Sequence, residues 1–258
     1  MSRHRIFVTA AMASICLISV AGKQADGAIP LDGQQAVTEA SQQGQYAFVL
    51  FYRTNDKATS AMLQEIQATL SSRNDATMIP VQVTDPAEKS LVDHFDASRL
   101  PMPSVAVIAP NGAVTGVMPQ RATQEQLVAA IISAGQADVV KALQEERIVL
   151  LCAQPDENPF VPQGVKDFQS DDLFKNRTSV VNLRATDPNE AAFLNQLQIP
   201  RDNDQPVVAF LAPPGVLLGT YKSNVTLSVL AQRLSAAGKC CDDPSCKHRT
   251  SQGNATRR

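Results

Sequence analysis

The segment near the C-terminus carries the densest reactive chemistry in the sequence. Cys240, Cys241, Cys246 and His248 lie within nine residues. Three thiolates and one imidazole can complete a tetrahedral Zn²⁺ site, and thiolates also bind Cu(I). The spacing does not match a common zinc module, because two adjacent cysteines fit poorly around one ion. The segment is a candidate zinc or copper site.

The same cysteines can form disulfides instead. Cys241 and Cys246 can close a small loop, which leaves Cys240 for Cys152 or for another chain. A disulfide between the adjacent residues Cys240 and Cys241 is strained, and strain raises the reduction potential. The sequence therefore leaves three interpretations open for this segment: a disulfide, a metal site and a reactive thiol group.

The N-terminal residues indicate export, which bears on the state of these thiols. Residues 1–5 are basic, residues 6–20 are apolar, and Ser19-Val20-Ala21 has the small residues that signal peptidase accepts. We predict a signal peptide over 1–21, a flexible lead-in over 22–31 and a mature protein in the periplasm or outside the cell. The apolar stretch is shorter than the roughly 20 residues of a spanning helix, so we expect no stable membrane span after cleavage. Disulfides persist in such a compartment.

The charge balance gives no reason to expect a nucleic-acid partner. Lys and Arg number 23 against 25 Asp and Glu, for a formal net charge of −2. A phosphate-binding protein concentrates basic residues on one face, and we find no such stripe in the sequence.

The rest of the chain is a repeat of domain size. Pro103 opens the apolar run Ser104 to Pro110, and Pro206 opens the similar run Val207 to Pro213, 103 residues later. Thr84-Asp85-Pro86-Ala87-Glu88 recurs as Thr186-Asp187-Pro188-Asn189-Glu190. A period of this length exceeds any solenoid unit and predicts two domains.

Each copy reads as alternating helices and strands. In the first copy, residues 46–52 form an apolar run typical of a strand buried on both faces. We predict helices over 32–43, 59–70 and from Thr123, and strands over 77–83, 105–108 and 113–117. Asp85 and Asp187 each precede a proline and stand three residues before a glutamate, which predicts a capping box at the start of a helix.

This order of elements resembles the thioredoxin fold. The resemblance covers 32–135 and 136–238 and implies an α/β architecture of two tandem thioredoxin-like domains, each a central mixed β-sheet flanked by helices. Met102-Pro103-Ser104 is similar to the loop in which the family has a cis-proline. The resemblance implies cis bonds at Met102–Pro103 and Gln205–Pro206. The tail, 239–258, lies outside both domains and is predicted to be disordered.

The cysteines that the family uses for thiol–disulfide exchange are missing. Laying the family's Cys-x-x-Cys motif over the sequence puts Asp56 and Thr59 at the cysteine positions of the first copy, and Asp156 and Pro159 at those of the second. Neither pair can exchange a disulfide, and a carboxylate at a helix N-terminus is a good cap. Ordinary thioredoxin activity at these positions is excluded.

We therefore predict an exported, non-catalytic protein that serves as a protein-binding or scaffolding module. The resemblance implies that the cis-proline loop can pair with an extended peptide by strand addition. The alternative is a thiol-redox or copper- or zinc-handling protein that uses the tail cysteines.

Overall fold

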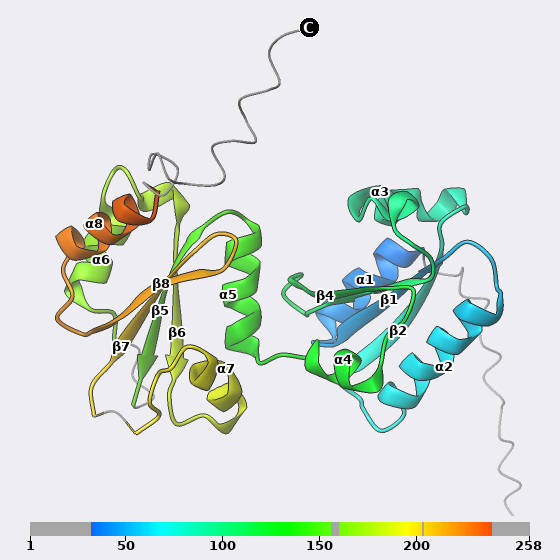
Figure 1. Cartoon of the computed structure of the whole chain (residues 1–258), viewed down its shortest axis with the longest axis horizontal. Coiled ribbons are helices and arrows are strands. Elements are labelled where there is room, and N and C mark those ends of the chain that lie inside the picture. The colour runs from blue at the N-terminus through cyan, green and yellow to red at the C-terminus, as the bar shows by residue number, and fades with distance from the viewer. Residues whose placement is uncertain (1–31, 156–159, 203, 239–258) are drawn as a thin grey trace, which may run out of the picture. The chain divides into compact units, whose positions relative to one another are not determined.

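The computed structural model describes residues 32–155, 160–202 and 204–238, and Figure 1 shows their arrangement. The predictions of a signal peptide, a lead-in and a C-terminal tail fall outside these residues. Two four-stranded sheets form the framework of the described part.

The first sheet has the strand order β2-β1-β3-β4. Its central strand β1 pairs in parallel with β2 and antiparallel with β3, and β3 pairs antiparallel with β4. The strands are β1 (Tyr46–Tyr52), β2 (Ala76–Gln82), β3 (Ser104–Ile108) and β4 (Val114–Pro119).

Helices cover both faces of this sheet. Alternate residues of β1 point to opposite faces, so Phe48 joins a core with α2 and α4, while Val49 joins a core with α1 and α3. This explains why β1 reads as a continuous apolar run. The helices are α1 (Gly33–Gln42), α2 (Lys57–Leu70), α3 (Lys89–His94) and α4 (Gln124–Ala129), and short 3-10 turns span Pro86–Glu88 and Ala97–Arg99.

The second sheet repeats this plan, with the order β6-β5-β7-β8 and the same strand directions. The core formed with α5 and α7 lies on one face, and the core formed with α6 and α8 lies on the other. The strands are β5 (Ile148–Gln154), β6 (Thr178–Arg184), β7 (Val207–Ala212) and β8 (Val216–Lys222). The helices are α5 (Ala134–Gln144), α6 (Gln163–Ser170), α7 (Ala191–Gln196) and α8 (Leu227–Gly238), with 3-10 turns over Lys175–Arg177 and Pro188–Glu190.

The chain thus folds as two tandem thioredoxin-like domains, and the predicted fold class is confirmed. In each domain a parallel strand pair is extended by an antiparallel hairpin, and helices lie on both faces. The second domain departs from the first after its central strand, because α6 has 8 residues where α2 has 14.

The predicted capping boxes are wrong in one respect. Asp85 and Asp187 accept hydrogen bonds from Ala87 N and Asn189 N, as caps do. The glutamates that follow reach away from their own turn: the side chain of Glu88 accepts from the backbone N–H of Gly33 at 2.9 Å, and that of Glu190 accepts from Gly135 N–H at 3.0 Å.

We call this long-range contact the glutamate latch. In both domains it spans 55 residues and ties the turn after the second strand to the start of the first helix. Each glycine is needed for the close approach, because a Cβ on Gly33 would stand 2.5 Å from Glu88 Oε2 and one on Gly135 would stand 2.0 Å from Leu183 Cδ2. Glu190 is buried and also accepts from the Ser133 hydroxyl at 2.6 Å, whereas Glu88 is half-buried.

Candidate functional site

The loop between β1 and α2 and the start of that helix contain Asp56 and Thr59, the first pair of positions that we predict to correspond to the family's cysteines. Asp56 is the N-cap of α2: its Oδ1 accepts from Thr59 N at 2.9 Å. The hydroxyl of Thr59 donates to the Thr54 carbonyl at 2.9 Å, and Thr59 is buried while Asp56 is exposed. The two side chains face the same turn of the helix, one at the surface and one beneath it.

Asp56 acts here as a structural carboxylate. The hydrogen bond from the Thr59 backbone holds the pKa of Asp56 below its ordinary value, with smaller contributions from the hydroxyls of Thr59 and Thr54. A carboxylate can neither form nor break a disulfide, so the position stabilises the helix and offers no thiol chemistry.

The cis-proline loop lies at the same end of the first sheet. Phe51 of β1 pairs with Ser104 of β3, so the chain leaves β1 toward Asp56 beside the point where it enters β3. The Met102–Pro103 bond is cis. Two hydrogen bonds hold the loop: Ser104 Oγ donates to the Pro101 carbonyl and Gln120 N to the Pro103 carbonyl, both at 2.6 Å.

The prediction of a cis bond at Gln205–Pro206 is wrong. The cis bonds of the described residues are Met102–Pro103 and Pro213–Pro214, the latter in the hairpin between β7 and β8. The two domains differ at the residue that follows the proline, because Val207 lacks the hydroxyl with which Ser104 closes its turn. The shared proline therefore marks the same strand entrance in both domains without the same bond geometry.

The second domain arranges the end of its central strand differently. Gln154, at the end of β5, is buried: its Oε1 accepts from Phe160 N at 2.6 Å, and its Nε2 donates to Asn182 Oδ1 at 3.2 Å. Sequence reasoning missed this role, because a lone glutamine at a strand end carries no signal of its own. Gln154 holds the chain where the first domain has the loop leading to Asp56.

The helix that follows β5 in the second domain is α6. Asp156 and Pro159 lie outside the described residues, and α6 starts only at Gln163. Pro162 is its N-cap and makes no side-chain capping hydrogen bond. The cap that Asp56 provides in the first domain therefore has no side-chain equivalent at the start of α6.

Cys152 is a core residue of β5 and belongs to the apolar cluster shared with α6 and α8. Burial raises the pKa of its thiol to about 12, so the thiolate is scarce at neutral pH. We expect Cys152 to resist iodoacetamide at pH 8 in the folded protein and to react within minutes in urea, as peptide mass spectrometry would show. Rapid labelling without denaturant would contradict this placement.

The tail residues Cys240, Cys241, Cys246 and His248 lie outside the described part, so their pairing and their metal binding stay predictions. Within the residues that the structure does describe, no three His, Cys, Asp or Glu side chains gather as a metal site. In the same residues no helix combines the length and the apolar character needed to cross a membrane.

Comparison with known proteins gives similarity at the level of the fold. No protein-family model matches the chain, and no curated protein matches it. Among solved structures, it resembles the first two thioredoxin domains of Saccharomyces cerevisiae Eps1p at 14% identity and a TM-score of 0.30, over 81% of this chain and 98% of that one.

Two further solved structures show likenesses of the same kind. Part of the alkylhydroperoxide reductase AhpF from Enterococcus faecalis is 13% identical, with a TM-score of 0.26, over 77% of this chain and 96% of that one. Zinc-bound human ERp44 is 9% identical, with a TM-score of 0.32, over 80% of this chain and 58% of that one. At these scores the assignment rests on the order and direction of the strands. The fold defines a tandem pair of thioredoxin-like domains, and the correspondence of Asp56 and Thr59 to the family's cysteines stays a prediction from the sequence.

Proposed function

We propose that the chain is an exported, non-catalytic protein that binds extended segments of other proteins at the cis-proline loop of its first domain. The observation that carries this proposal is a free backbone at Met102. Among the described residues, neither its N–H nor its C=O has a hydrogen-bond partner, although the loop around it is held on both sides. A strand of another chain can pair with these groups.

The surroundings of Met102 suit an extended peptide. Met102, Leu100 and Tyr52 are each half-buried, so the loop offers apolar side chains beside the free backbone groups. Main-chain hydrogen bonds supply affinity in strand addition, and such side chains supply selectivity. Because Asp56 holds the neighbouring helix end without a thiol, bound segments would be released without covalent exchange.

The proposal can be tested by measuring how fast a cysteine introduced at position 56 reacts with a disulfide probe. The probe is an unfolded peptide whose single cysteine is joined to thionitrobenzoate; the variant's thiolate attacks the peptide sulfur, and thionitrobenzoate leaves as the coloured thiolate. The reference probe is free cysteine carrying the same leaving group. If peptides dock beside residue 56, Asp56→Cys reacts at least tenfold faster with the peptide than with the reference probe.

The matched control is Asp85→Cys, because Asp85 is also an exposed capping aspartate but follows β2, which β1 separates from β3 and its cis-proline loop. We expect no peptide preference there, and a reduced preference when Met102→Asp is added to Asp56→Cys. Equal preference at both positions would refute docking at the loop. Both variants are made in a background where the cysteines outside the described residues are serine: Cys16, Cys240, Cys241 and Cys246.

Export and the tail complete the proposal. We propose that the N-terminal segment directs the protein to the periplasm or the cell exterior, and that Cys241 and Cys246 form a disulfide there. Zinc or copper binding by the tail, with His248 as a fourth ligand, is the alternative. Native mass spectrometry of the protein recovered from its compartment separates the two: loss of two hydrogens supports the disulfide, and added metal mass supports the metal site.

A further inference from the structure

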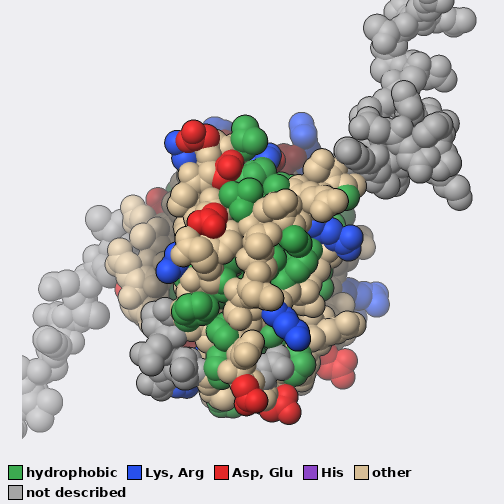
Figure 2. Space-filling model, turned by 90° about the vertical axis from the view of Figure 1, so that its left-hand side faces the viewer, with side chains coloured by type: hydrophobic (Ala, Val, Ile, Leu, Met, Phe, Trp, Pro, Cys, Tyr) green, Lys and Arg blue, Asp and Glu red, His purple; other side chains and the backbone are tan. Residues whose placement is uncertain are grey.

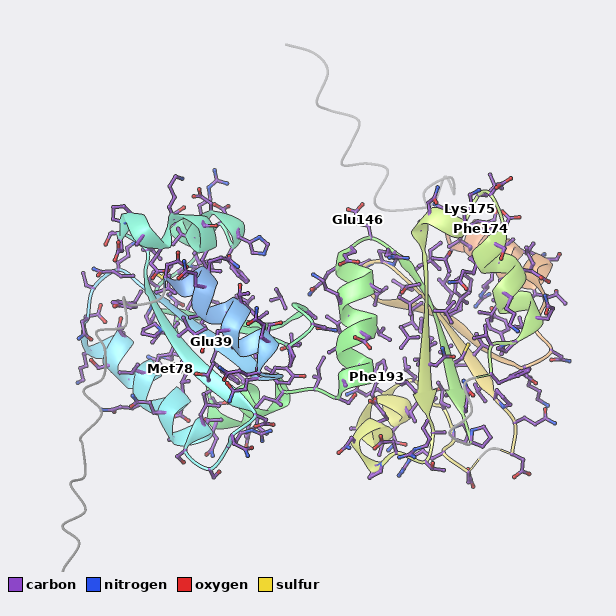
Figure 3. The ribbon with its side chains drawn as sticks, turned by 180° about the vertical axis from the view of Figure 1, so that it is seen from behind. Glu39, Met78, Glu146, Phe174, Lys175 and Phe193 are labelled. Carbon is purple, nitrogen blue, oxygen red and sulfur yellow. The ribbon has the colours of Figure 1, made fainter. Side chains whose placement is uncertain are left out.

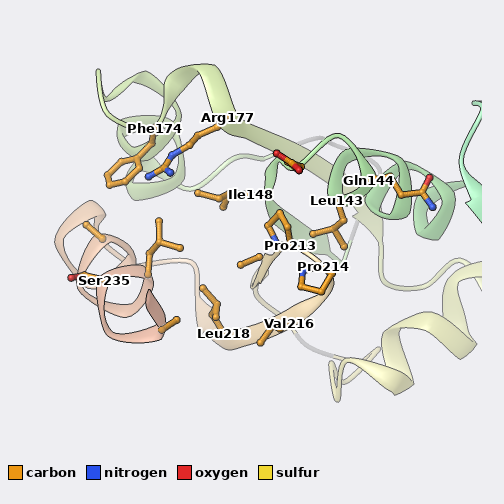
Figure 4. A pocket seen from close by; sticks show the side chains of 15 residues that line it. Leu143, Gln144, Ile148, Phe174, Arg177, Pro213, Pro214, Val216, Leu218 and Ser235 are labelled. Carbon is orange, nitrogen blue, oxygen red and sulfur yellow. The ribbon is translucent and has the colours of Figure 1, made fainter. Parts of the chain in front are cut away.

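The second domain contains a pocket at the end of its sheet that lies opposite Pro206, beside the Pro213–Pro214 turn (Figure 4). Its volume is about 1040 Å³. The helices α5 and α8, the β7–β8 hairpin and the start of β5 form its walls. The lining residues used below are Glu146, Ile148, Phe174, Arg177, Leu218 and Ser235.

This pocket lies far from the end of its own domain that corresponds to the proposed peptide site of the first domain. Ile148 is the first residue of β5 and lines the pocket, whereas Gln154 is the last residue of the same strand. Six residues of strand at about 3.3 Å each put roughly 20 Å between the two ends. A ligand in the pocket would leave the far end of the domain open.

The walls are largely apolar and built into the core. Ile148, Phe174 and Leu218 belong to the same buried cluster, and their side chains face the cavity. Phe174 stacks on Phe168, with ring centroids 4.2 Å apart, which fixes this wall. The volume is at the top of the roughly 300–1,000 Å³ typical of small-molecule pockets. Figure 2 shows hydrophobic side chains reaching the surface on this side of the domain.

One cation that lines the pocket has no counter-ion among the described residues. The Arg177 guanidinium lies 5.5 Å from the centroid of the Phe174 ring. It makes no ion pair or hydrogen bond with any residue in the described ranges. The other ionisable lining residue, Glu146, follows the end of α5, while Phe174 lies beside α6 (Figure 3). The apolar walls and the free guanidinium therefore match a ligand with an apolar body and an anionic end.

The first domain shows how the same position can be closed. Tyr46 begins β1 as Ile148 begins β5, 102 residues apart. The Tyr46 ring is buried in the core, and its hydroxyl donates to the Ile132 carbonyl at 2.6 Å. Asp75 stands where Arg177 stands in the second domain and is ion-paired with Arg73. The two copies thus differ at both features that make the pocket: the space and the free cation.

We propose that the second domain binds an amphipathic monocarboxylate, such as a free fatty acid, with its alkyl chain against the apolar walls and its carboxylate beside Arg177. The probe is dodecanoate below its micellar concentration, added to the full chain and followed by isothermal titration calorimetry. Dodecyltrimethylammonium, with the same chain and the opposite charge, is the comparison. We expect dodecanoate to bind at least tenfold more tightly.

Two kinds of variant test the site. Arg177→Gln should weaken dodecanoate binding about tenfold, the cost of one exposed charge-assisted contact, and Glu146→Gln should not weaken it. Ile148→Tyr copies the first domain and should abolish binding while the circular dichroism spectrum stays unchanged. Ser235→Phe, on an exposed position of α8, fills the pocket from the other side should Ile148→Tyr fail to fold.

The proposal is overturned if dodecanoate does not bind the full chain, if both probes bind equally, or if Arg177→Gln leaves the affinity unchanged. It is also overturned if neither filling variant weakens binding. Because the Met102 site lies at the far end of another domain, Met102→Asp should not alter dodecanoate binding, so this proposal and the peptide proposal fail independently.

Discussion

Replacing Gly164 by Ala is expected to destabilise the second domain by about 3 kcal/mol, the upper range for overpacking a core. A Cβ on Gly164 would stand 2.1 Å from the Val225 carbonyl oxygen and 2.8 Å from Thr226 Cα. Both are backbone atoms, so α6 and the start of α8 must move apart. The direction of the stability change is informative, because Gly→Ala inside a helix ordinarily stabilises the protein by about 1 kcal/mol.

Urea unfolding followed by circular dichroism measures this effect. We expect a lower midpoint at an unchanged m-value, which reports lost stability without a change in the surface exposed. Lys166→Ala, on the exposed side of the same helix, is the matched control and should lie within about 0.5 kcal/mol of the wild type. Equal midpoints for Gly164→Ala and the control would mean that α6 does not pack as closely as described.

Removing the glutamate latch of the second domain is expected to destabilise that domain by a similar amount. In Glu190→Ala, the buried Gly135 N–H and the Ser133 hydroxyl both lose their acceptor. Leaving a buried donor unsatisfied costs about 1–3 kcal/mol, and hydrogen bonds to charged groups lie at the upper end. We expect a loss of about 3 kcal/mol in the free energy of unfolding, with a smaller loss for Glu190→Gln, which keeps an acceptor oxygen.

The first domain supplies the comparison. Glu88 makes the same contact with Gly33 but is half-buried, and within the described residues its side chain accepts that bond alone. Burial raises the pKa of Glu88, with the nearby Asp32 and Asp85 adding to the rise, so its charged form is held less favourably than in water. Glu88→Ala should therefore cost only about 1 kcal/mol. A larger loss of unfolding free energy for Glu88→Ala than for Glu190→Ala would contradict the argument that the more deeply buried glutamate contributes more stability.

Local pattern predicted much of each domain. The apolar run at 46–52 became β1 with the same bounds, because strands buried on both faces keep every position apolar. The helix predicted from Thr123 is present as α4, and it begins with a capping box in which Gln126 accepts from the Thr123 backbone N–H. These features depend on neighbours within a few residues, which is why sequence reasoning finds them.

Local sequence pattern did not predict the features that depend on distant residues. Glu88 stands where a local capping box predicts a glutamate, yet its partner lies 55 residues earlier in the chain. Gln154 and Ile148 carry no local sequence signal. Gln154 is placed by its hydrogen bond with Phe160 N, and Ile148 lines the pocket because the second domain has no tyrosine ring at that position.

The difference between the copies also bears on function. The first domain keeps an open cis-proline loop and fills the far end of its sheet with Tyr46, whereas the second closes its strand end with Gln154 and leaves the far end hollow. The two proposals therefore assign different binding tasks to the two copies, since function resides in the sites rather than in the fold.

The central claim is that the positions of the family's cysteines serve structure and binding without redox chemistry, and insulin reduction with dithiothreitol as electron donor tests it most directly. We predict that the full chain precipitates insulin no faster than dithiothreitol alone. The double variant Asp56→Cys and Thr59→Cys, which restores the motif at the helix N-terminus, should accelerate precipitation. Acceleration by the wild-type chain would contradict the account. If that acceleration disappears when Cys240, Cys241 and Cys246 are changed to Ser, the activity belongs to the tail.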